Sequence, residues 1–114
     1  MAKRRCISVD FYESEEFLSL SDKAKVLYTG LILRSDDEGV VINHGISLRL
    51  LGLSSKYFDE LIQKGFVLDI DGVFVIRHWY LHNKVQPTRI VHSLYQQELS
   101  KLYVSDRKTY ELDE

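Results

Sequence analysis

Cysteine and proline are almost absent from this 114-residue sequence, which contains one of each, Cys6 and Pro87. A single cysteine excludes a disulfide framework within one chain and favours a reducing compartment. No apolar run approaches the roughly 18 residues that a membrane-spanning helix needs, and no apolar stretch follows the basic start to form a secretory signal. These absences predict a cytoplasmic protein that does not bind membranes.

Residue patterns that carry catalysis or bind metals are also missing. The sequence has no glycine-rich phosphate loop, and Cys6 with four scattered histidines is too generic to indicate a nucleophile. His78 and His82 have a spacing that suits zinc on a helix, but no cysteine or carboxylate is suitably placed to complete the site. The adjacent carboxylates of residues 36–38 diverge along the chain rather than converge on an ion. We therefore expect a protein that is not an enzyme and that holds neither metal nor cofactor.

The composition, with 45% hydrophobic and 28% charged residues, is that of one globular domain. The net charge of −2 argues against nucleic-acid binding, but the charges are unevenly distributed. Acidic residues gather in 13–16, 36–38 and 106–114, whereas residues 40–92 carry six basic side chains against four acidic ones. The middle of the chain is therefore mildly basic, and residues 3–5 add a basic N-terminal arm.

Hydrophobic periodicity predicts three helices in the first two thirds of the chain. Ser21 is a good N-cap for the first, which ends before Gly39 and contains Gly30, a position that weakens the helix or admits a close neighbour. Asn43 caps the second helix, which ends at Leu51, and Gly52 fits the left-handed position after it. Ser54 or Ser55 caps the third helix, which Gly65 ends in the same way.

The remaining segments predict short strands and loops. Residues 7–11 alternate as an edge strand or extended arm, a helical turn follows them, and residues 40–42 form a small strand. Residues 66–79 form a hairpin, for which a three-residue loop with Gly72 left-handed places Phe66, Leu68, Phe74 and Ile76 on one face. Residues 94–104 suggest one short amphipathic helix, and residues 105–114 a frayed end or linker.

This order of elements predicts an α+β, mainly helical fold: a winged helix-turn-helix with an N-terminal arm and a short C-terminal helix. The chain divides into an N-terminal arm and helical turn (1–20), a winged-helix domain (21–80), and a loop, short helix and frayed tail (81–114). With Gly52 as the turn glycine, apolar residues fall where the helix-turn-helix pattern requires them, although Leu48 stands where a small residue is preferred. The alternative is that two helices merely pack at a corner.

If the third helix reads DNA, its exposed side and the basic residues around it supply the contacts. Lysines and arginines suit phosphates, whereas serine and glutamine suit phosphates or base edges. The candidate DNA-binding residues are Lys3, Arg4, Arg5, Ser55, Lys56, Gln63, Lys64, Arg77, Lys84 and Arg89. Asp59 and Glu60 face the same way and repel phosphate unless they pair with lysines at helical spacing. The alternative is a solvated helix face laced with ion pairs.

Two stretches resemble a known family. "FLSLSDKAKVLYTGLILRSDDEGVV" and "LIQKGFVLDIDGVFVIRHWYLHNKV" are similar to the N-terminal domain of phage replisome organisers, which are related to DnaD-type primosomal proteins. The basic start "MAKRR" and the stretch "YQQELSKL" also look familial, so the resemblance covers most of residues 1–104. It implies a winged-helix domain at the front of a replication-initiation protein, in a bacterial host cytoplasm. Family members usually continue into a second domain, so the resemblance implies a fragment or a short relative.

Two functions follow as hypotheses. The first is a double-stranded DNA-binding module of a phage replication initiator that helps assemble the replication machinery at an origin. The second is a self-association or protein-docking module of the same machinery, whose interface includes the third helix and the strand at residues 7–11. Expected partners are origin DNA, further copies of the chain, and helicase-loading or primosomal proteins.

Overall fold

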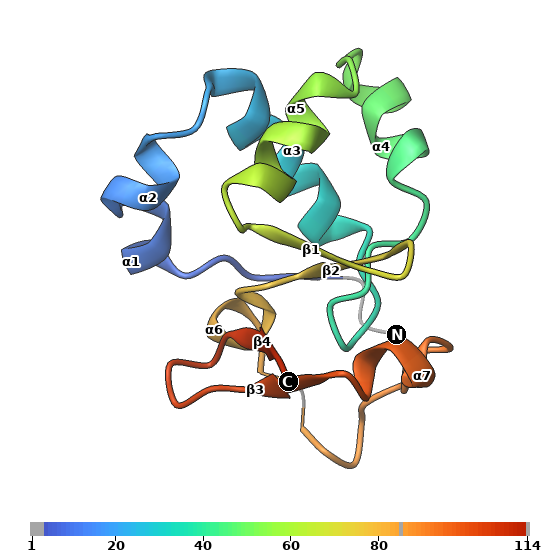
Figure 1. Cartoon of the computed structure of the whole chain (residues 1–114). Coiled ribbons are helices and arrows are strands. Elements are labelled where there is room, and N and C mark those ends of the chain that lie inside the picture. Colours follow the sequence, from blue (N-terminus) through green and yellow to red (C-terminus); the bar gives the residue numbers. More distant parts are fainter. Residues whose placement is uncertain (1–3, 85, 114) are drawn as a thin grey trace.

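The computed structural model describes residues 4–84 and 86–113 of the chain (Figure 1). Within them, seven helices and two two-stranded antiparallel sheets form an α+β domain with a radius of gyration of 13.3 Å, the value expected of a compact domain of this length. The elements are α1 (Val9–Tyr12), α2 (Glu15–Leu18), α3 (Asp22–Leu33), α4 (His44–Leu51), α5 (Lys56–Gln63), β1 (Val67–Ile70), β2 (Val73–Ile76), α6 (Trp79–His82), α7 (Gln96–Leu99), β3 (Leu102–Val104) and β4 (Tyr110–Leu112). The longest helix has 12 residues, and no helix in this described part could span a membrane.

Two of the predicted helix caps are confirmed. The Ser21 hydroxyl accepts the Ala24 N–H at 3.2 Å, and the Asn43 side chain accepts the Ile46 N–H at 3.3 Å. Each bond satisfies a backbone donor that the first turn leaves without a helical partner. Ser55 does stand at the N-cap position of α5, but its side chain makes no capping hydrogen bond, so that part of the prediction is wrong.

The chain turns sharply between α4 and α5. Gly52 is left-handed at φ 67°, the Leu53 N–H donates to the Leu48 carbonyl at 2.9 Å, and the Gly52 N–H donates to the Arg49 carbonyl at 3.3 Å. These two bonds form a Schellman motif, which terminates a helix and satisfies its last carbonyls. Gly30 of α3 allows α4 to approach, because a Cβ there would lie 2.9 Å from Leu51 Cδ1. The predicted break after Leu51 is therefore confirmed.

The hairpin β1–β2 is confirmed, but its predicted three-residue loop is wrong. The pairing Ile70↔Val73 leaves a two-residue turn in which both Asp71 (φ 52°) and Gly72 (φ 86°) are left-handed. This is the type I′ geometry, whose twist matches that of the strands. The prediction assumed one buried face, yet the adjacent residues Val75 and Ile76 are both buried. Alternation therefore could not identify the register.

The small strand predicted at residues 40–42 lies along the free edge of β2, although only as an isolated bridge. Val40 bridges Val75, the Val41 N–H donates to the Phe74 carbonyl at 2.8 Å, and the Ile76 N–H donates to the Gly39 carbonyl at 2.8 Å. Both edges of β2 are thus occupied.

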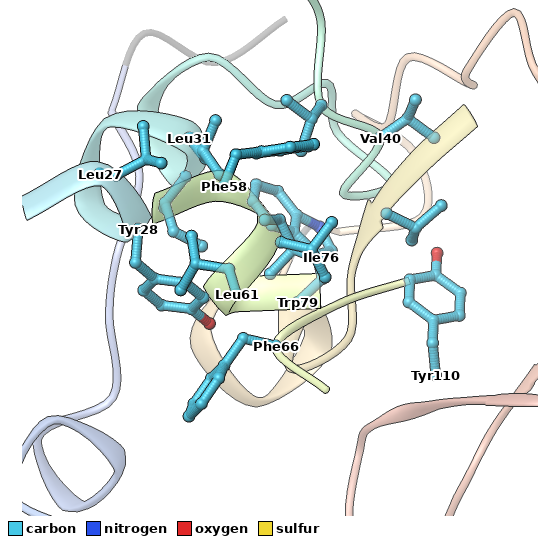
Figure 2. Close-up of a cluster of buried hydrophobic side chains, with 14 of the residues drawn as sticks. Leu27, Tyr28, Leu31, Val40, Phe58, Leu61, Phe66, Ile76, Trp79 and Tyr110 are labelled. Carbon is cyan, nitrogen blue, oxygen red and sulfur yellow. The ribbon is translucent and has the colours of Figure 1, made fainter. Parts of the chain in front are cut away.

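The hydrophobic core lies between α3, α5 and the hairpin (Figure 2). Leu27, Tyr28 and Leu31 of α3 face Leu61 of α5, and all four side chains are fully buried. The core also takes residues from both ends of the chain. The largest additional members are Phe11, Phe17, Phe58, Phe66, Trp79 and Tyr110.

Three predictions at the ends of the chain are wrong. No strand forms at residues 7–11: Val9–Tyr12 are helix α1, whose N-cap Ser8 accepts the Phe11 N–H at 3.4 Å. Ile7 and Phe11 pack against the core, and no strand in the described residues pairs with this segment. The helix expected over residues 94–104 covers only Gln96–Leu99. The tail is not frayed, because β4 pairs with β3 and buries Tyr110.

Candidate nucleic-acid interface

The exposed side of α5 carries several of the predicted contacts. Phe58 and Leu61 point into the core, which leaves Ser55, Lys56 and Gln63 exposed. The ring of Tyr57 is partly buried and lies close to two cations: Lys56 Nζ is 5.0 Å from its centroid, and Lys23 Nζ of α3 is 5.7 Å from it. We call Lys23, Ser55, Lys56, Tyr57 and Gln63 the α5 surface. It combines positive charge, an aromatic ring and hydrogen-bonding side chains.

The acidic residue Glu60 is engaged by its neighbours. The Ser21 N–H and hydroxyl donate to its carboxylate at 2.8 and 2.7 Å, and Lys64 Nζ lies 3.9 Å away. Partial burial alone would raise the pKa of Glu60. The hydrogen bonds from Ser21 and the charge of Lys64 outweigh this effect, so the pKa of Glu60 is lowered. Lys64 also donates to the Ser19 carbonyl at 2.8 Å. Lys64 is therefore bound to groups of the protein itself and is less available to phosphate. Asp59 on the same helix is exposed, and its negative charge repels phosphate.

The turn of the hairpin presents no cation of its own. Asp69 Oδ1 accepts the Gly72 N–H at 2.9 Å, and Asp71 forms an ion pair with Lys101, which comes from the chain before β3. Pairing reduces the negative charge at the turn without making it attractive to phosphate.

Arg5 is not part of a flexible arm, contrary to the prediction. Its side chain is only 3% exposed, and its Nη2 lies 3.0 Å from Asp37 Oδ1 and donates to the Ser35 carbonyl at 2.9 Å. Its guanidinium carbon lies 5.2 Å from the ring centroid of Trp79. Arg4 is exposed, whereas Lys3 lies outside the described residues.

Arg77 is also engaged. Its Nη2 lies 2.9 Å from Glu111 Oε2, which additionally accepts the Thr109 hydroxyl at 2.7 Å. The Thr109 and Arg77 hydrogen bonds lower the pKa of Glu111. A phosphate would compete with this carboxylate for Arg77.

The remaining predicted cations lie after α6. Lys84 lines a cavity of about 320 Å³, which also receives Lys108, while Arg89 is exposed in a turn where its N–H donates to the Gln86 carbonyl at 2.8 Å. Figure 1 shows α5 and α6 on opposite sides of the β1–β2 hairpin. The predicted site residues that stay exposed therefore fall into separate groups rather than one surface.

The histidines with zinc-like spacing belong to the core. His82 Nε2 lies 2.8 Å from the Tyr28 hydroxyl, and His82 Nδ1 accepts the Ser8 N–H at 3.0 Å. The Phe11 ring packs against both His78 and His82 with centroids 4.6 Å apart. In the described part of the chain, no three His, Cys, Asp or Glu side chains converge in a way that could hold a metal ion.

Sequence reasoning missed Lys23 and Lys108 as members of basic surfaces. Lys23 lies in the first turn of a helix in which the sequence pattern indicates only the buried apolar positions. Lys108 lies in the tail that was expected to fray. Comparison of the chain with known protein families, with curated proteins and with solved structures found no match.

Proposed function

We propose that this chain is a non-enzymatic, DNA-binding winged-helix domain of a phage replication initiator, of the replisome-organiser type. In this proposal α3, α4 and α5 are the three helices, the bend at Gly52 is the turn, and β1–β2 with residues 39–41 is the wing. The resemblance of residues 17–41 and 61–85 to replisome organisers supports the link to replication. The domain would act in the bacterial host cytoplasm and help recruit primosomal proteins.

The observation that carries the proposal is the α5 surface. The Schellman bend directs α5 away from α4, and Lys56 and Lys23 lie close to the Tyr57 ring at the start of that helix. In helix-turn-helix proteins the N-terminal residues of the second helix contact DNA in the major groove. Lys23 and Lys56 would meet phosphates, while Ser55 and Gln63 would meet phosphates or base edges.

The charges predict weak binding with a shallow dependence on salt. The hairpin turn offers no cation, Lys64 and Arg77 are engaged by Glu60 and Glu111, and Asp59 repels phosphate. Few phosphate contacts remain, and each contributes only about 0.9 to the slope of log affinity against log salt.

Fluorescence anisotropy with duplex DNA at several salt concentrations tests the proposal. Lys56→Ala and Lys23→Ala should each weaken binding and reduce the slope of log affinity against log salt by about 0.9. Lys25→Ala is the matched control, because Lys25 is two residues from Lys23 on α3, points to another side of the helix, and pairs with Asp22 at 3.6 Å. Absence of duplex binding at low salt, or equal losses in Lys25→Ala, would contradict the proposal.

Recognition of base edges by α5 is tested by comparing binding to origin-derived and random duplexes. Gln63→Ala should reduce binding to the origin-derived duplex more than to the random one, whereas Lys56→Ala should weaken both alike. Equal effects of Gln63→Ala on the two duplexes would show that α5 contacts phosphates and no base edges.

A second candidate function, self-association, is favoured by one specific observation. A continuous apolar surface joins the end of α3, α4 and the chain before α7, where two cavities of about 660 and 210 Å³ share Leu33 and Arg34. Such a large exposed apolar area usually marks an interface. The exposed apolar side chains of this surface are Leu33, Ile42, Leu50, Leu51, Val91, Leu94 and Tyr95.

Sedimentation velocity separates the two candidates. Leu94 is 94% exposed, so Leu94→Asp should leave the fold intact and shift an oligomer toward monomer. A wild-type chain that stays monomeric at high concentration would exclude self-association through this surface. The interface proposed from sequence cannot use a strand at residues 7–11, since that strand does not form.

A further inference from the structure

A cavity of about 320 Å³ opens where α6 meets the C-terminal hairpin. Its described lining comes from α6 and the two residues after it, from strand β3, and from the turn before β4. The lining residues are Tyr80, Asn83, Lys84, Val104 and Lys108. We call it the Tyr80 cavity. Its volume is at the lower end of the roughly 300–1,000 Å³ range of small-molecule sites.

The walls of this cavity are held in place by hydrogen bonds and ring packing. The Asn83 side chain accepts the Cys6 N–H at 2.8 Å and donates to the Cys6 carbonyl at 3.2 Å. The Tyr80 ring lies 5.4 Å from the ring of Tyr110, whose hydroxyl donates to the Glu38 carbonyl at 2.6 Å. A site whose walls are already ordered loses little entropy when a ligand binds.

Lys108 reaches the cavity from a strained backbone. Its φ is 63°, a left-handed conformation that glycine and asparagine adopt easily and that is unfavourable for a lysine. The turn is fixed by the Lys108 N–H donating to the Ser105 carbonyl at 2.9 Å and the Ser105 N–H donating to the Thr109 carbonyl at 2.8 Å. Strain of this kind concentrates at functional positions.

The charges and surfaces of the cavity define its ligand. Lys84 and Lys108 both line the cavity, and no carboxylate is among the lining residues that the structure describes. Tyr80 and Val104 add an aromatic and an apolar side chain to the lining. An anionic group beside a flat aromatic group is the chemistry of a nucleotide, in which phosphate pairs with lysine and the base packs on an aromatic side chain.

We propose that the Tyr80 cavity binds one unpaired nucleotide of a single-stranded nucleic acid. The cavity has room for a single base, and bases in a duplex are stacked and paired, so only a single strand can offer one. Arg4 is exposed two residues before Cys6, whose backbone bonds Asn83, so it adds a cation near the cavity for a neighbouring phosphate.

This site is separate from the α5 surface and does not depend on it. Figure 1 places α6 and the β3–β4 hairpin on the opposite side of β1–β2 from α5. A chain with both sites would hold duplex DNA at one end and an unwound strand at the other.

The test measures binding of the full chain to fluorescein-labelled oligo(dT), to a labelled duplex of equal length, and to free dTMP as competitor. The double variant Lys84→Ala/Lys108→Ala should lose about tenfold in oligo(dT) affinity, because two phosphate contacts are removed, and should keep its duplex affinity. Arg107→Ala is the matched control: Arg107 precedes Lys108 in the same turn but lines a different cavity, of about 740 Å³. It should stay within about twofold of wild type.

Lys108→Gly separates loss of the ammonium group from loss of folding. Glycine relieves the strain at φ 63°, so this variant should unfold at the same or a higher urea concentration while its oligo(dT) affinity falls. Unchanged oligo(dT) binding in the double variant overturns the proposal, as does an equal loss in Arg107→Ala. Binding of dTMP as tight as that of oligo(dT) overturns the assignment to a strand. Failure of Lys56→Ala to affect duplex binding would count against the α5 surface alone.

Discussion

Arg5 shows how a charge that looks available in the sequence becomes structural. Its guanidinium joins Asp37, the Ser35 carbonyl and the Trp79 ring, and both members of the ion pair are nearly inaccessible to water. A buried pair of this kind holds its partners in register, since removal of one leaves the other charge in a poorly solvated place. Arg5 is thereby fixed against the loop after α3.

Arg5→Ala should therefore lower the free energy of unfolding by about 3–5 kcal/mol, because it breaks a buried ion pair. Urea unfolding measures it. Arg4→Ala is the control, since Arg4 is exposed and its loss should cost no more than about 0.5 kcal/mol. Adding Asp37→Asn to the Arg5→Ala chain should recover part of the loss, because it removes the remaining buried charge. Equal stabilities of the two single variants would contradict this account.

His82 is a second residue whose role was not visible in the sequence. It accepts the Ser8 N–H at Nδ1, so in the neutral ring the proton stands on Nε2 and is donated to the Tyr28 hydroxyl. Burial, and after it the charge of His78, lowers the pKa of His82 to about 4. Burial, and after it the charge of Arg77, lowers the pKa of His78 to about 4.

Stability should therefore fall as the pH is lowered from about 6.5 to about 4. In that window the unfolded chain binds protons that the folded chain excludes, so the free energy of unfolding rises with pH. Full stability from these two histidines is present above pH 6.5. Urea unfolding at several pH values measures the slope. His82→Gln should be less stable at pH 7. Its free energy of unfolding should change less with pH, by the equivalent of about one bound proton, because the variant lacks this titrating group. An unchanged slope of unfolding free energy against pH would show that His82 does not titrate as proposed.

At the scale of elements, the bend between α4 and α5 depends on a conformation rather than on a contact. A Cβ added to Gly52 would meet no atom within 4 Å, so its left-handed φ of 67° is the reason for glycine there. Gly45, inside α4, has no such φ, and a Cβ there would lie 3.5 Å from Asn43 Oδ1, an ordinary contact.

Gly52→Ala should lower the free energy of unfolding by about 1–2 kcal/mol, the cost of a left-handed alanine. Gly45→Ala should raise it by up to about 1 kcal/mol, because alanine favours the helix. Denaturant titrations of both variants give the comparison. Two changes of the same sign would contradict the assigned backbone conformations.

The C-terminal strand β4 is a structural element rather than a loose end. Tyr110 is 5% exposed, its backbone N–H donates to the Arg77 carbonyl at 2.8 Å, and its hydroxyl donates to the Glu38 carbonyl. Burial raises the pKa of Tyr110, so it remains a neutral donor.

Tyr110→Ala should lower the free energy of unfolding by about 3–5 kcal/mol through the cavity it leaves. Tyr110→Phe should cost about 1 kcal/mol, the value of one hydrogen bond. Leu112→Ala on the same strand is the control, since Leu112 is 53% exposed and should change stability by no more than about 0.5 kcal/mol. If Tyr110→Ala matched Leu112→Ala in thermal or urea unfolding, the strand would contribute nothing.

At the scale of the whole molecule, the core joins segments that are distant in sequence. Phe11, Leu61, Trp79 and Tyr110 belong to one buried cluster, so the N-terminal arm and the C-terminal hairpin share their apolar contacts with the central helices. A chain that buries one core unfolds as one unit.

Trp79 is fully buried and its indole N–H donates to the Asp37 carbonyl at 3.0 Å, which makes its fluorescence a probe of this core. Urea transitions followed by Trp79 fluorescence and by far-ultraviolet circular dichroism should coincide. A fragment of residues 21–80, which lacks Phe11, Phe17 and Tyr110, should not fold cooperatively. Two separate transitions would show that the ends of the chain fold independently.

The sequence by itself determined the elements whose causes are local. Ser21, Asn43 and Gly52 mark helix ends because a cap or a left-handed glycine acts within a few residues, and the stripe of Leu27, Tyr28 and Leu31 follows from helical spacing. Tertiary structure alone decided the hairpin register, the helical form of residues 9–12, the pairing of the tail, and the removal of Arg5 and Arg77 from the available cations. The ion pairs of Arg5 and Arg77 and the bond from the Tyr110 N–H to the Arg77 carbonyl join residues 30 or more apart. The hairpin register and the form of residues 9–12 depend on which faces other segments cover. Short-range patterns carry no information about such distant partners.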